Sequence, residues 1–177
     1  LNTNANVSYV TGSHAFKAGV NQEWGYDDWA RIKRGDMVVL SFLSGRPRAV
    51  TVANTPTAQQ NHLNADLGLF AQDKWTLGRL TLTGGIRYDY FTASVPAGTA
   101  PAGRFVPARE AAGVNCVPCS NDWAIRGGAS YDLFGTGKTA LKFSVGKFLA
   151  SQALGIASAV NPLGFQSTVS AGVVSAL

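Results

Sequence analysis

The chain has 177 residues, 20 of them glycine, and its charged residues make up 14%, against about 25% in an average soluble domain. No window approaches roughly 18 uninterrupted apolar residues, which excludes a transmembrane helix. The net charge of +5 comes from 15 Lys and Arg against 10 Asp and Glu. These charges form neither a basic run nor a basic helix face, so nucleic acid is not an expected partner.

The first third of the chain predicts four short strands, expected at residues 2–10, 14–24, 36–43 and 48–53. Glycine-containing turns are expected at 11–13 and 44–47. Two polar stretches without periodicity, 25–35 and 54–63, are expected to be loops.

The clearest pattern is the stretch from Leu67 to Tyr90, which predicts one β-hairpin. Its second half alternates apolar and polar residues for about a dozen positions, a period of two that places the apolar side chains on one face of a strand. The turn is expected at 76–79, with Gly78 free to adopt a positive φ. An alternation this long exceeds the usual five or six residues of a soluble strand and approaches the roughly 9–11 residues that cross a bilayer.

After the hairpin, a Pro/Ala/Gly-rich stretch at 94–121 predicts a long loop. Alternation resumes at Trp123 and again at Leu141, with a short turn at 134–138 between the two strands. The segment 150–177 is rich in small residues and predicts no clear element. Short and long connections therefore alternate along the chain, as the periplasmic turns and extracellular loops of outer-membrane barrels do.

These observations predict an all-β fold, an antiparallel transmembrane β-barrel of which the chain supplies about eight strands. The polar face of those strands would point to the lumen, and its expected members are Arg87, Asp89, Arg126, Asp132 and Lys142. Aromatic residues near strand ends are expected to anchor the membrane interface, namely Trp24, Trp75, Tyr88, Tyr90, Trp123 and Tyr131.

Two short motifs each allow more than one interpretation. The GTGKT at 135–139 has the end of a phosphate-binding loop, but Asp132 stands where that motif needs glycine and a strand is expected to follow, so a hairpin turn is favoured. Cys116 and Cys119 have redox or metal spacing, but the chain has no other cysteine, and both His14 and His62 lie in other segments. A disulfide within the long loop is the preferred interpretation. No catalytic constellation, metal site or cofactor is expected.

Several segments resemble TonB-dependent outer-membrane receptors, with the Oar-like branch as the nearest match. They are FAQDKW at 70–75, LTLTGGIRYDY at 80–90, WAIRGGASYDLFGTGKT at 123–139 and LKFSVGKF at 141–148. The resemblance implies a barrel of 22 strands closed by a separate plug, and active transport of a bulky ligand across the outer membrane. The chain is expected to be an internal part of such a receptor, because it shows no plug domain and no C-terminal aromatic strand; it ends in Ala176-Leu177.

The expected function is therefore that of an outer-membrane receptor or transporter rather than an enzyme. Its partners would be the lipid of the outer membrane, an unidentified ligand, and a TonB-type energising complex engaged only through parts that this chain lacks. Two alternatives are a complete small barrel with a structural or adhesive role and a soluble β-rich binding module. Gly85, Gly128, Ser130, Ser144 and Gly146 leave the polar face sparsely packed, which favours a wide lumen over a small filled barrel.

Overall fold

The computed structural model of the chain describes residues 1–32, 34–150 and 153–170. Its strands are β1 (Asn2–Thr11), β2 (His14–Arg31), β3 (Val39–Leu43), β4 (Arg46–Ala53), β5 (Thr57–Leu77), β6 (Leu80–Ser94), β7 (Gly98–Ala100), β8 (Arg109–Ala111), β9 (Cys119–Asp132), β10 (Ala140–Gly146) and β11 (Ser167–Ser170). A short 3-10 helix, η1 (Arg34–Met37), and one helix, α1 (Gly155–Val160), complete the elements. The end of the unassigned C-terminal segment, including Ala176 and Leu177, lies outside the described residues.

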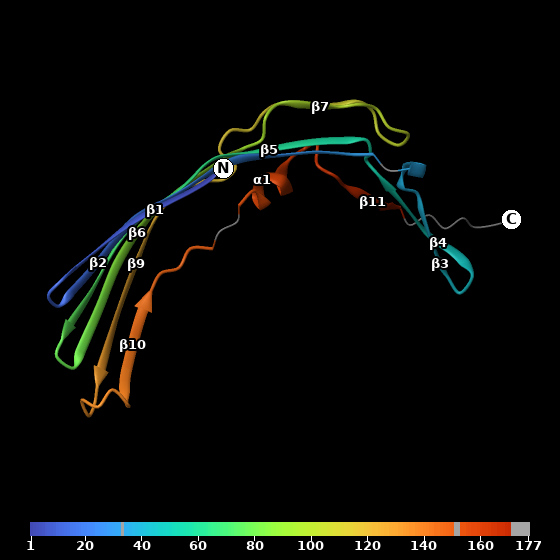
Figure 1. Cartoon of the computed structure of the whole chain (residues 1–177). Helices are drawn as coiled ribbons and strands as arrows, with labels where there is room; N and C mark the ends of the chain where they lie inside the picture. The colour runs from blue at the N-terminus through green and yellow to red at the C-terminus, as the bar shows by residue number, and fades with distance from the viewer. Residues whose placement is uncertain (33, 151–152, 171–177) are drawn as a thin grey trace. The chain divides into compact units, whose positions relative to one another are not determined.

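The chain divides into two compact units. The first contains residues 1–25, 63–92 and 118–153 and holds most of a six-stranded sheet with the order β1-β2-β5-β6-β9-β10 (Figure 1). The pairs β1–β2, β6–β9 and β9–β10 are antiparallel. The β6–β9 ladder is unbroken from the pair Leu80 and Tyr131 to the pair Thr92 and Cys119. The sheet does not close on itself, because β1 and β10 stand at its two edges.

The register gives the sheet one apolar and one polar face. Residues that pair directly across two strands share a face, and Leu82, Ala129 and Phe143 form one such row across β6, β9 and β10. The next row, Thr83, Gly128 and Ser144, points the other way. The apolar face is uncovered by protein: Ile125, Leu141 and Phe143 are 63%, 66% and 70% exposed. Large apolar side chains left bare in this way fit a surface that lies against lipid.

The predicted hairpin at 67–90 is confirmed. β5 ends at Leu77 and β6 begins at Leu80, and Gly78 has a φ of +57°, which an L side chain would adopt only with strain. The strand expected after the GTGKT motif is also confirmed, as β10. The all-β, antiparallel character predicted from the alternation holds throughout the described residues, apart from α1 and η1.

Two predicted loops are largely strand, which corrects the sequence analysis. Residues 25–31 continue β2, and residues 57–63 belong to β5. In this region Gln60 donates a hydrogen bond to Asp28 across the two strands, at 3.1 Å, and Tyr26 lies edge-on to His62 at 6.3 Å. Both faces carry polar residues here, so the strands have no period-two signal.

The expected count of about eight sheet strands is corrected as well. The strands predicted at 36–43 and 48–53 correspond to η1 with β3 and to β4. β3 and β4 do not join the six-stranded sheet but form a second sheet with the order β11-β4-β3. The turn at 44–45 gives them a hairpin of their own, with positive φ at Ser44 and Gly45.

The second unit contains residues 26–62, 93–117 and 154–177 within its bounds and is built from the long connections. The predicted loop at 94–121 is partly ordered, since β7 and β8 pair as a small hairpin and Val95 bridges Val114. The unit buries small apolar residues such as Ala93, Ala100 and Ala157 beside fully buried Gln59 and Asn61. Within the described parts of the chain, no helix has the length and apolar character to cross a membrane.

We expect Gly19→Ala to destabilise the sheet. A Cβ at Gly19 would lie 2.7 Å from the carbonyl oxygen of Ala5 and from the ring of Phe70, so strand or ring must shift. The cost should be about 1–3 kcal/mol in the free energy of unfolding, the usual range for overpacking. The measurement is the urea midpoint of the detergent-purified protein. Gly84→Ala is the matched control, because a Cβ there meets nothing within 4 Å. Equal midpoints for the two variants would contradict this packing.

Candidate functional site

The polar face of the six-stranded sheet carries an ion pair at its centre. Arg87 and Asp89 lie two residues apart on β6, and the guanidinium Nη2 and Nε lie 2.7 Å from the Asp89 Oδ1. Gly68 on the neighbouring β5 makes room for this pair, because a Cβ there would overlap the Arg87 guanidinium. The alternation of β6 therefore places both predicted residues on the same face.

More carboxylates lie across the same face than the sequence analysis identified. Asp122 on β9 is the direct cross-strand partner of Asp89, and Asp66 on β5 lies within electrostatic range of Glu23, Asp89 and Arg87. Lys147 pairs with Asp122 at 3.1 Å. We call this group the charged row; its members are Glu23, Asp66, Arg87, Asp89, Asp122 and Lys147. Four carboxylates face two cations, a local excess of two negative charges in a chain whose net charge is +5.

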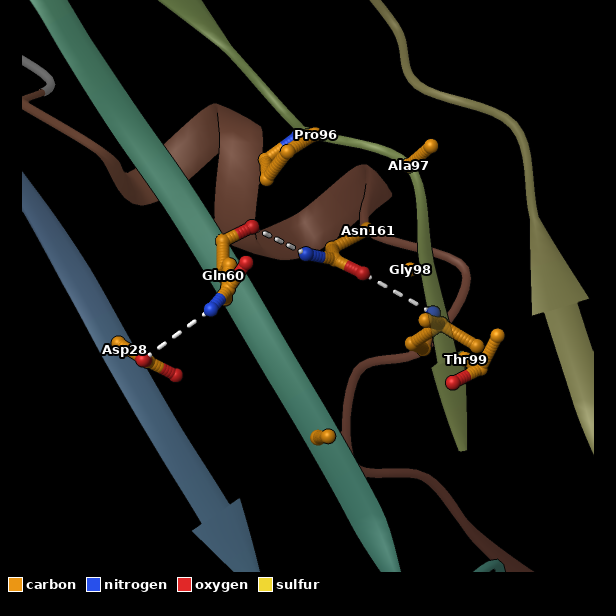
Figure 2. Close-up of a pocket in the computed structure, with 9 residues that line it drawn as sticks. Asp28, Gln60, Pro96, Ala97, Gly98, Thr99 and Asn161 are labelled. Carbon is orange, nitrogen blue, oxygen red and sulfur yellow. Dashed lines mark hydrogen bonds between the residues drawn. The ribbon is translucent and has the colours of Figure 1, made fainter. Parts of the chain in front are cut away.

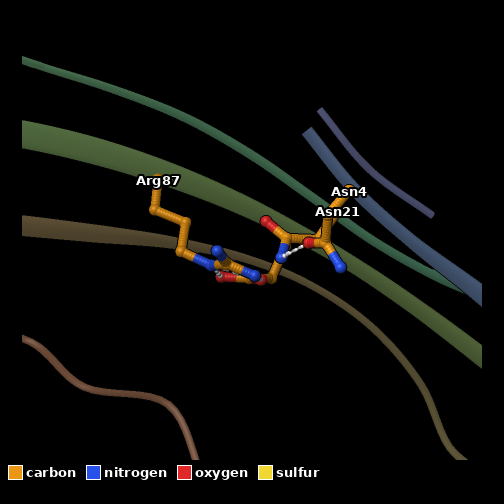
Figure 3. A network of polar contacts seen from close by, with 4 residues as sticks. Asn4, Asn21 and Arg87 are labelled. Carbon is orange, nitrogen blue, oxygen red and sulfur yellow. Dashed lines mark hydrogen bonds and ion pairs between the residues drawn. The ribbon is translucent and has the colours of Figure 1, made fainter. Parts of the chain in front are cut away.

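An amide network extends the row to the edge strand. The side chain of Asn2 donates to Glu23 at 3.4 Å, Asn4 donates to Asn2 at 2.7 Å, and Asn21 donates to Asn4. Figure 3 shows the Asn4–Asn21 contact together with Arg87. The spacing of two between Asn2 and Asn4, and between Asn21 and Glu23, is visible in the sequence. The register of β1 and β2 places all four residues on one face, and this could be recognised only once the strand pairing was known.

Arg126 and Lys142 lie on the polar face but outside the charged row. Arg126 stands opposite Gly85 and Gly146, and Lys142 stands opposite Ser130. A hollow of about 660 Å³ lies beside Arg126 in the sheet unit, and Gly85, Ser144, Val145 and Phe148 are among its lining residues. Its walls are therefore mixed, and Arg126 stands there among small and apolar residues.

Asp132 has a different role from the other predicted polar residues. It is the last residue of β9, and its carboxylate accepts hydrogen bonds from the N–H groups of Gly137 (2.8 Å), Gly135 (3.0 Å) and Phe134 (3.3 Å). The N–H of Gly137, together with those of Gly135 and Phe134, holds the pKa of the Asp132 carboxyl below its usual range. The N–H groups of the GTGKT segment thus serve the chain's own carboxylate, in line with the predicted hairpin turn.

The six aromatic residues expected at the interface all lie on the apolar face, in two groups. Tyr88 and Trp123 are direct partners with ring centroids 4.9 Å apart, and Tyr131 stands eight residues from Trp123 on β9. Eight residues span roughly 26 Å of strand, or about 20 Å along the membrane normal at a tilt near 40°, close to the ~25 Å apolar band of such barrels. The group near the short turns is Trp75 and Tyr131; the far group is Trp24, Tyr88, Tyr90 and Trp123.

One cluster on the apolar face escaped the sequence analysis. The His14 ring stacks on Phe16 and Trp75, at 5.3 and 5.2 Å between centroids, and its Nδ1 lies 2.7 Å from Asp73 Oδ2. The indole of Trp75 donates to the Ser13 hydroxyl at 3.1 Å. A polar pair set among aromatic rings beside a turn is the arrangement expected where a strand leaves the hydrocarbon for the headgroups.

Cys116 and Cys119 are both disulfide-bonded, at the point where the long connection ends and β9 begins. Val117, between them, donates a backbone hydrogen bond to the carbonyl of Ala93 at 2.6 Å. Among the described residues, no group of three or more His, Cys, Asp or Glu side chains is arranged to hold a metal ion.

Protonation of Asp132 should loosen the β9–β10 turn. Because the folded-state pKa is depressed, the stabilisation is fully present above the ordinary value of 3.8 and is lost as the pH falls through the lower folded value. We expect hydrogen exchange at the Gly135 and Gly137 amides, corrected for intrinsic rates, to accelerate below pH 3.8. Asp132→Asn should remove this acid-dependent step. Identical acid responses in the two proteins would refute the assignment.

Removing the cation at the centre of the charged row should cost stability. Arg87→Met leaves Asp89, Asp66 and Glu23 facing one another, and we expect a loss of about 0.5–1 kcal/mol at low salt, shrinking as salt screens the repulsion. Adding Asp89→Asn to this variant should recover part of the loss. Urea titrations at two salt concentrations provide the test. Arg87→Met with a salt-independent effect would mean that the lost packing of the side chain, not its charge, matters.

Comparison with known families agrees with this geometry. A family sequence model described as "Outer membrane beta barrel domain" matches residues 1–175. No similar curated protein and no similar solved structure was found. The match covers nearly the whole chain, and an antiparallel sheet with one apolar and one polar face is what the wall of such a barrel consists of. The chain therefore belongs to the outer membrane β-barrel domain family and is located in the outer membrane of a Gram-negative-type bacterium.

Proposed function

We propose that the chain forms part of a TonB-dependent receptor of the Oar-like type, which binds a ligand and transports it across the outer membrane. The observation that carries this proposal is the open, two-faced sheet. Its apolar face is bare and banded by aromatic residues, whereas its polar face holds charged side chains in an unfilled surface. In a membrane barrel, a polar face that other side chains do not fill lines a lumen, and a solute can pass along that lumen.

The small residues on the polar face favour a wide lumen and therefore a large barrel. A barrel of about eight strands must fill its narrow interior with side chains, but the polar face here presents Gly85, Gly128, Ser130, Ser144 and Gly146. The two edge strands of the six-stranded sheet also favour a large barrel. Among the described residues β1 and β10 have one neighbour each, and the bilayer requires that exposed N–H and C=O groups on such edges be paired. We infer that further strands continue the wall on both sides.

The roles of the residues follow from this arrangement. Arg87, Asp89, Arg126 and Lys142 would line the lumen, where water solvates them, and the aromatic groups would hold the wall at the two membrane interfaces. The long connections that make up the second unit would face the exterior and meet the ligand first. The protein would act as a receptor and not as an enzyme, and it would not bind nucleic acid. It would engage an energising complex through segments outside this chain.

The experiment is conductance in planar lipid bilayers of the protein purified from outer membranes. A plugged wide barrel should conduct little until urea releases the plug, and should then open large, stable pores. The alternative, a small filled barrel with a structural or adhesive role, should stay closed under both conditions, and this outcome would end the transport proposal. The soluble-module alternative is set aside by the family assignment.

A variant pair tests the lumen assignment in the same preparation. Arg126→Glu should shift the open pore towards cation selectivity, because a charge on the lumen wall attracts counter-ions into the pore. Ile125→Val, one residue away and on the apolar face, is the matched control and should leave selectivity unchanged. A shift in the control, or none in Arg126→Glu, would show that the two faces have been assigned the wrong way round.

A further inference from the structure

The β3–β4 hairpin of the second unit leaves one strand uncovered. β3 is the outer strand of the sheet with the order β11-β4-β3, so one of its backbone edges has no neighbouring strand among the described residues. All five residues of β3 are exposed. Its four large apolar side chains are between 50% and 60% exposed, and they are those of Val39, Leu40, Phe42 and Leu43. An unpaired backbone edge and bare apolar side chains therefore coincide on one short strand.

β3 lacks the residues with which proteins usually protect an edge strand. Exposed edges are commonly blunted by a charged residue or a proline on the strand itself. The sequence of β3, VLSFL, contains neither. The opposite edge of the same sheet is β11, whose sequence STVS consists mostly of small polar residues. An apolar edge without such protection is a place where another extended segment can add a strand.

The sheet is anchored inside the second unit. The side chain of Asn54, which follows β4, donates to the Gly164 carbonyl at 2.9 Å and accepts from the Gln166 N–H at 2.8 Å. Asn161, which precedes β11, donates to the Gln60 carbonyl of β5 at 2.9 Å (Figure 2). These bonds join β4 and the segment leading into β11 to each other and to β5, and β3 is held through its ladder with β4. The free edge of β3 is therefore formed before any partner arrives.

The hairpin is also strongly basic. Residues 31–48 contain four Arg and one Lys against one Asp, a net charge of +4 in a chain whose total is +5. Arg34, Arg46 and Arg48 are exposed, and none of them has an ion pair or a hydrogen bond among the residues that the structure describes. Arg46 is the direct cross-strand partner of Leu43 on β3. A partner at this edge would therefore meet cations that no carboxylate of the described chain neutralises.

We propose that β3 binds an extended segment of a separate, acidic polypeptide, which adds a fourth strand to this sheet. The added strand pairs its N–H and C=O groups with the free edge of β3. Because the side chains of a strand alternate between two faces, apolar residues at every second position cover Leu40 and Phe42, which share one face. The acidic residues between them lie on the other face, which carries Leu43 and Arg46.

Two other occupants fit this edge less well. A lipid surface would cover the apolar side chains, and its phosphates would attract the arginines, but hydrocarbon would leave the free N–H and C=O groups of β3 unpaired. A second copy of the chain could pair with β3, but it would bring its own net charge of +4 against that of the first copy. An acidic strand satisfies the backbone edge, the apolar side chains and the arginines together.

The test is the fluorescence anisotropy of a labelled synthetic peptide that alternates Glu and Val, mixed with the whole protein in nanodiscs of phosphatidylcholine. We expect saturable binding that weakens as salt rises, because salt screens the attraction between the charges. A peptide with Lys in place of Glu should bind at least about tenfold more weakly. A fully N-methylated peptide keeps the side chains but loses every N–H donor, and it should not bind. Equal binding of either control peptide, or no binding of the parent peptide, would overturn the proposal.

Two variant pairs locate the site on β3. Phe42→Thr removes apolar area but keeps a good strand former, and it should lower the affinity for the Glu/Val peptide about fivefold. Phe105→Thr is its matched control, because Phe105 is 46% exposed and lies outside this sheet. Arg46→Glu should lower the affinity about five- to tenfold at low salt, and Arg104→Glu makes the same charge change outside the sheet. Urea midpoints confirm that each variant is folded. The assignment to β3 fails if the variants and their controls bind alike.

The same preparation identifies the other occupants. Displacement of the peptide by vesicles of phosphatidylglycerol would assign the edge to lipid, and a dimer that Phe42→Thr dissociates would assign it to a second copy, so either result overturns the proposal. None of these measurements needs transport. A failure to bind the peptide would leave the proposed transport activity untouched, and a closed barrel in the bilayer experiment would leave the edge of β3 untouched.

Discussion

The rest of the structure depends on one constraint, the need to pair every backbone N–H and C=O group that lies in hydrocarbon. The β6–β9 ladder meets it without a break over thirteen residue pairs. Once the ladder is fixed, the pleat leaves each side chain only two directions. Lipid on one side and water on the other then decide which residue types occupy each face. Leu82 and Phe143 on the one side and Thr83 and Ser144 on the other follow from this choice.

The same constraint explains which parts of the fold the sequence could predict. Between the two aromatic groups the environments of the faces differ most, so the alternation in 80–90 and 141–146 is clean and the predicted strands agree with β6 and β10. The turn at Gly78 was predictable for a separate reason, because the positive φ of a tight turn selects glycine. The residues on the polar face of each strand could therefore be predicted from the local sequence, but the contacts between strands across that face could not.

Outside the six-stranded sheet unit the alternation is lost. Residues 25–31 and 57–62 continue β2 and β5 with polar residues on both faces, and they were predicted to be loops. In the second unit Gln59 is buried by a contact with Ser158, 99 residues away, and Asn61 by a contact with Asn161, 100 residues away. A buried amide is stable only when its partners are in place, and a sequence window cannot show partners so distant.

Polar side chains are stabilised in different ways in the two units. On the sheet, Asp89 stands opposite Asp122, and this like-charge pair persists because Arg87 and Lys147 neutralise it and because the side chains remain partly exposed. A substitution in this arrangement should cost only about 0.5–1 kcal/mol, as predicted for Arg87→Met, because water can replace a lost partner. In the second unit the buried amides of Gln59 and Asn161 have definite partners, Ser158 for the first and Gln60, Asn61 and Leu163 for the second, so their geometry is fixed more strictly. In the second unit the same loss would leave a buried polar group unpaired, at a cost of about 1–3 kcal/mol, so the contacts between its distant segments are needed for its packing.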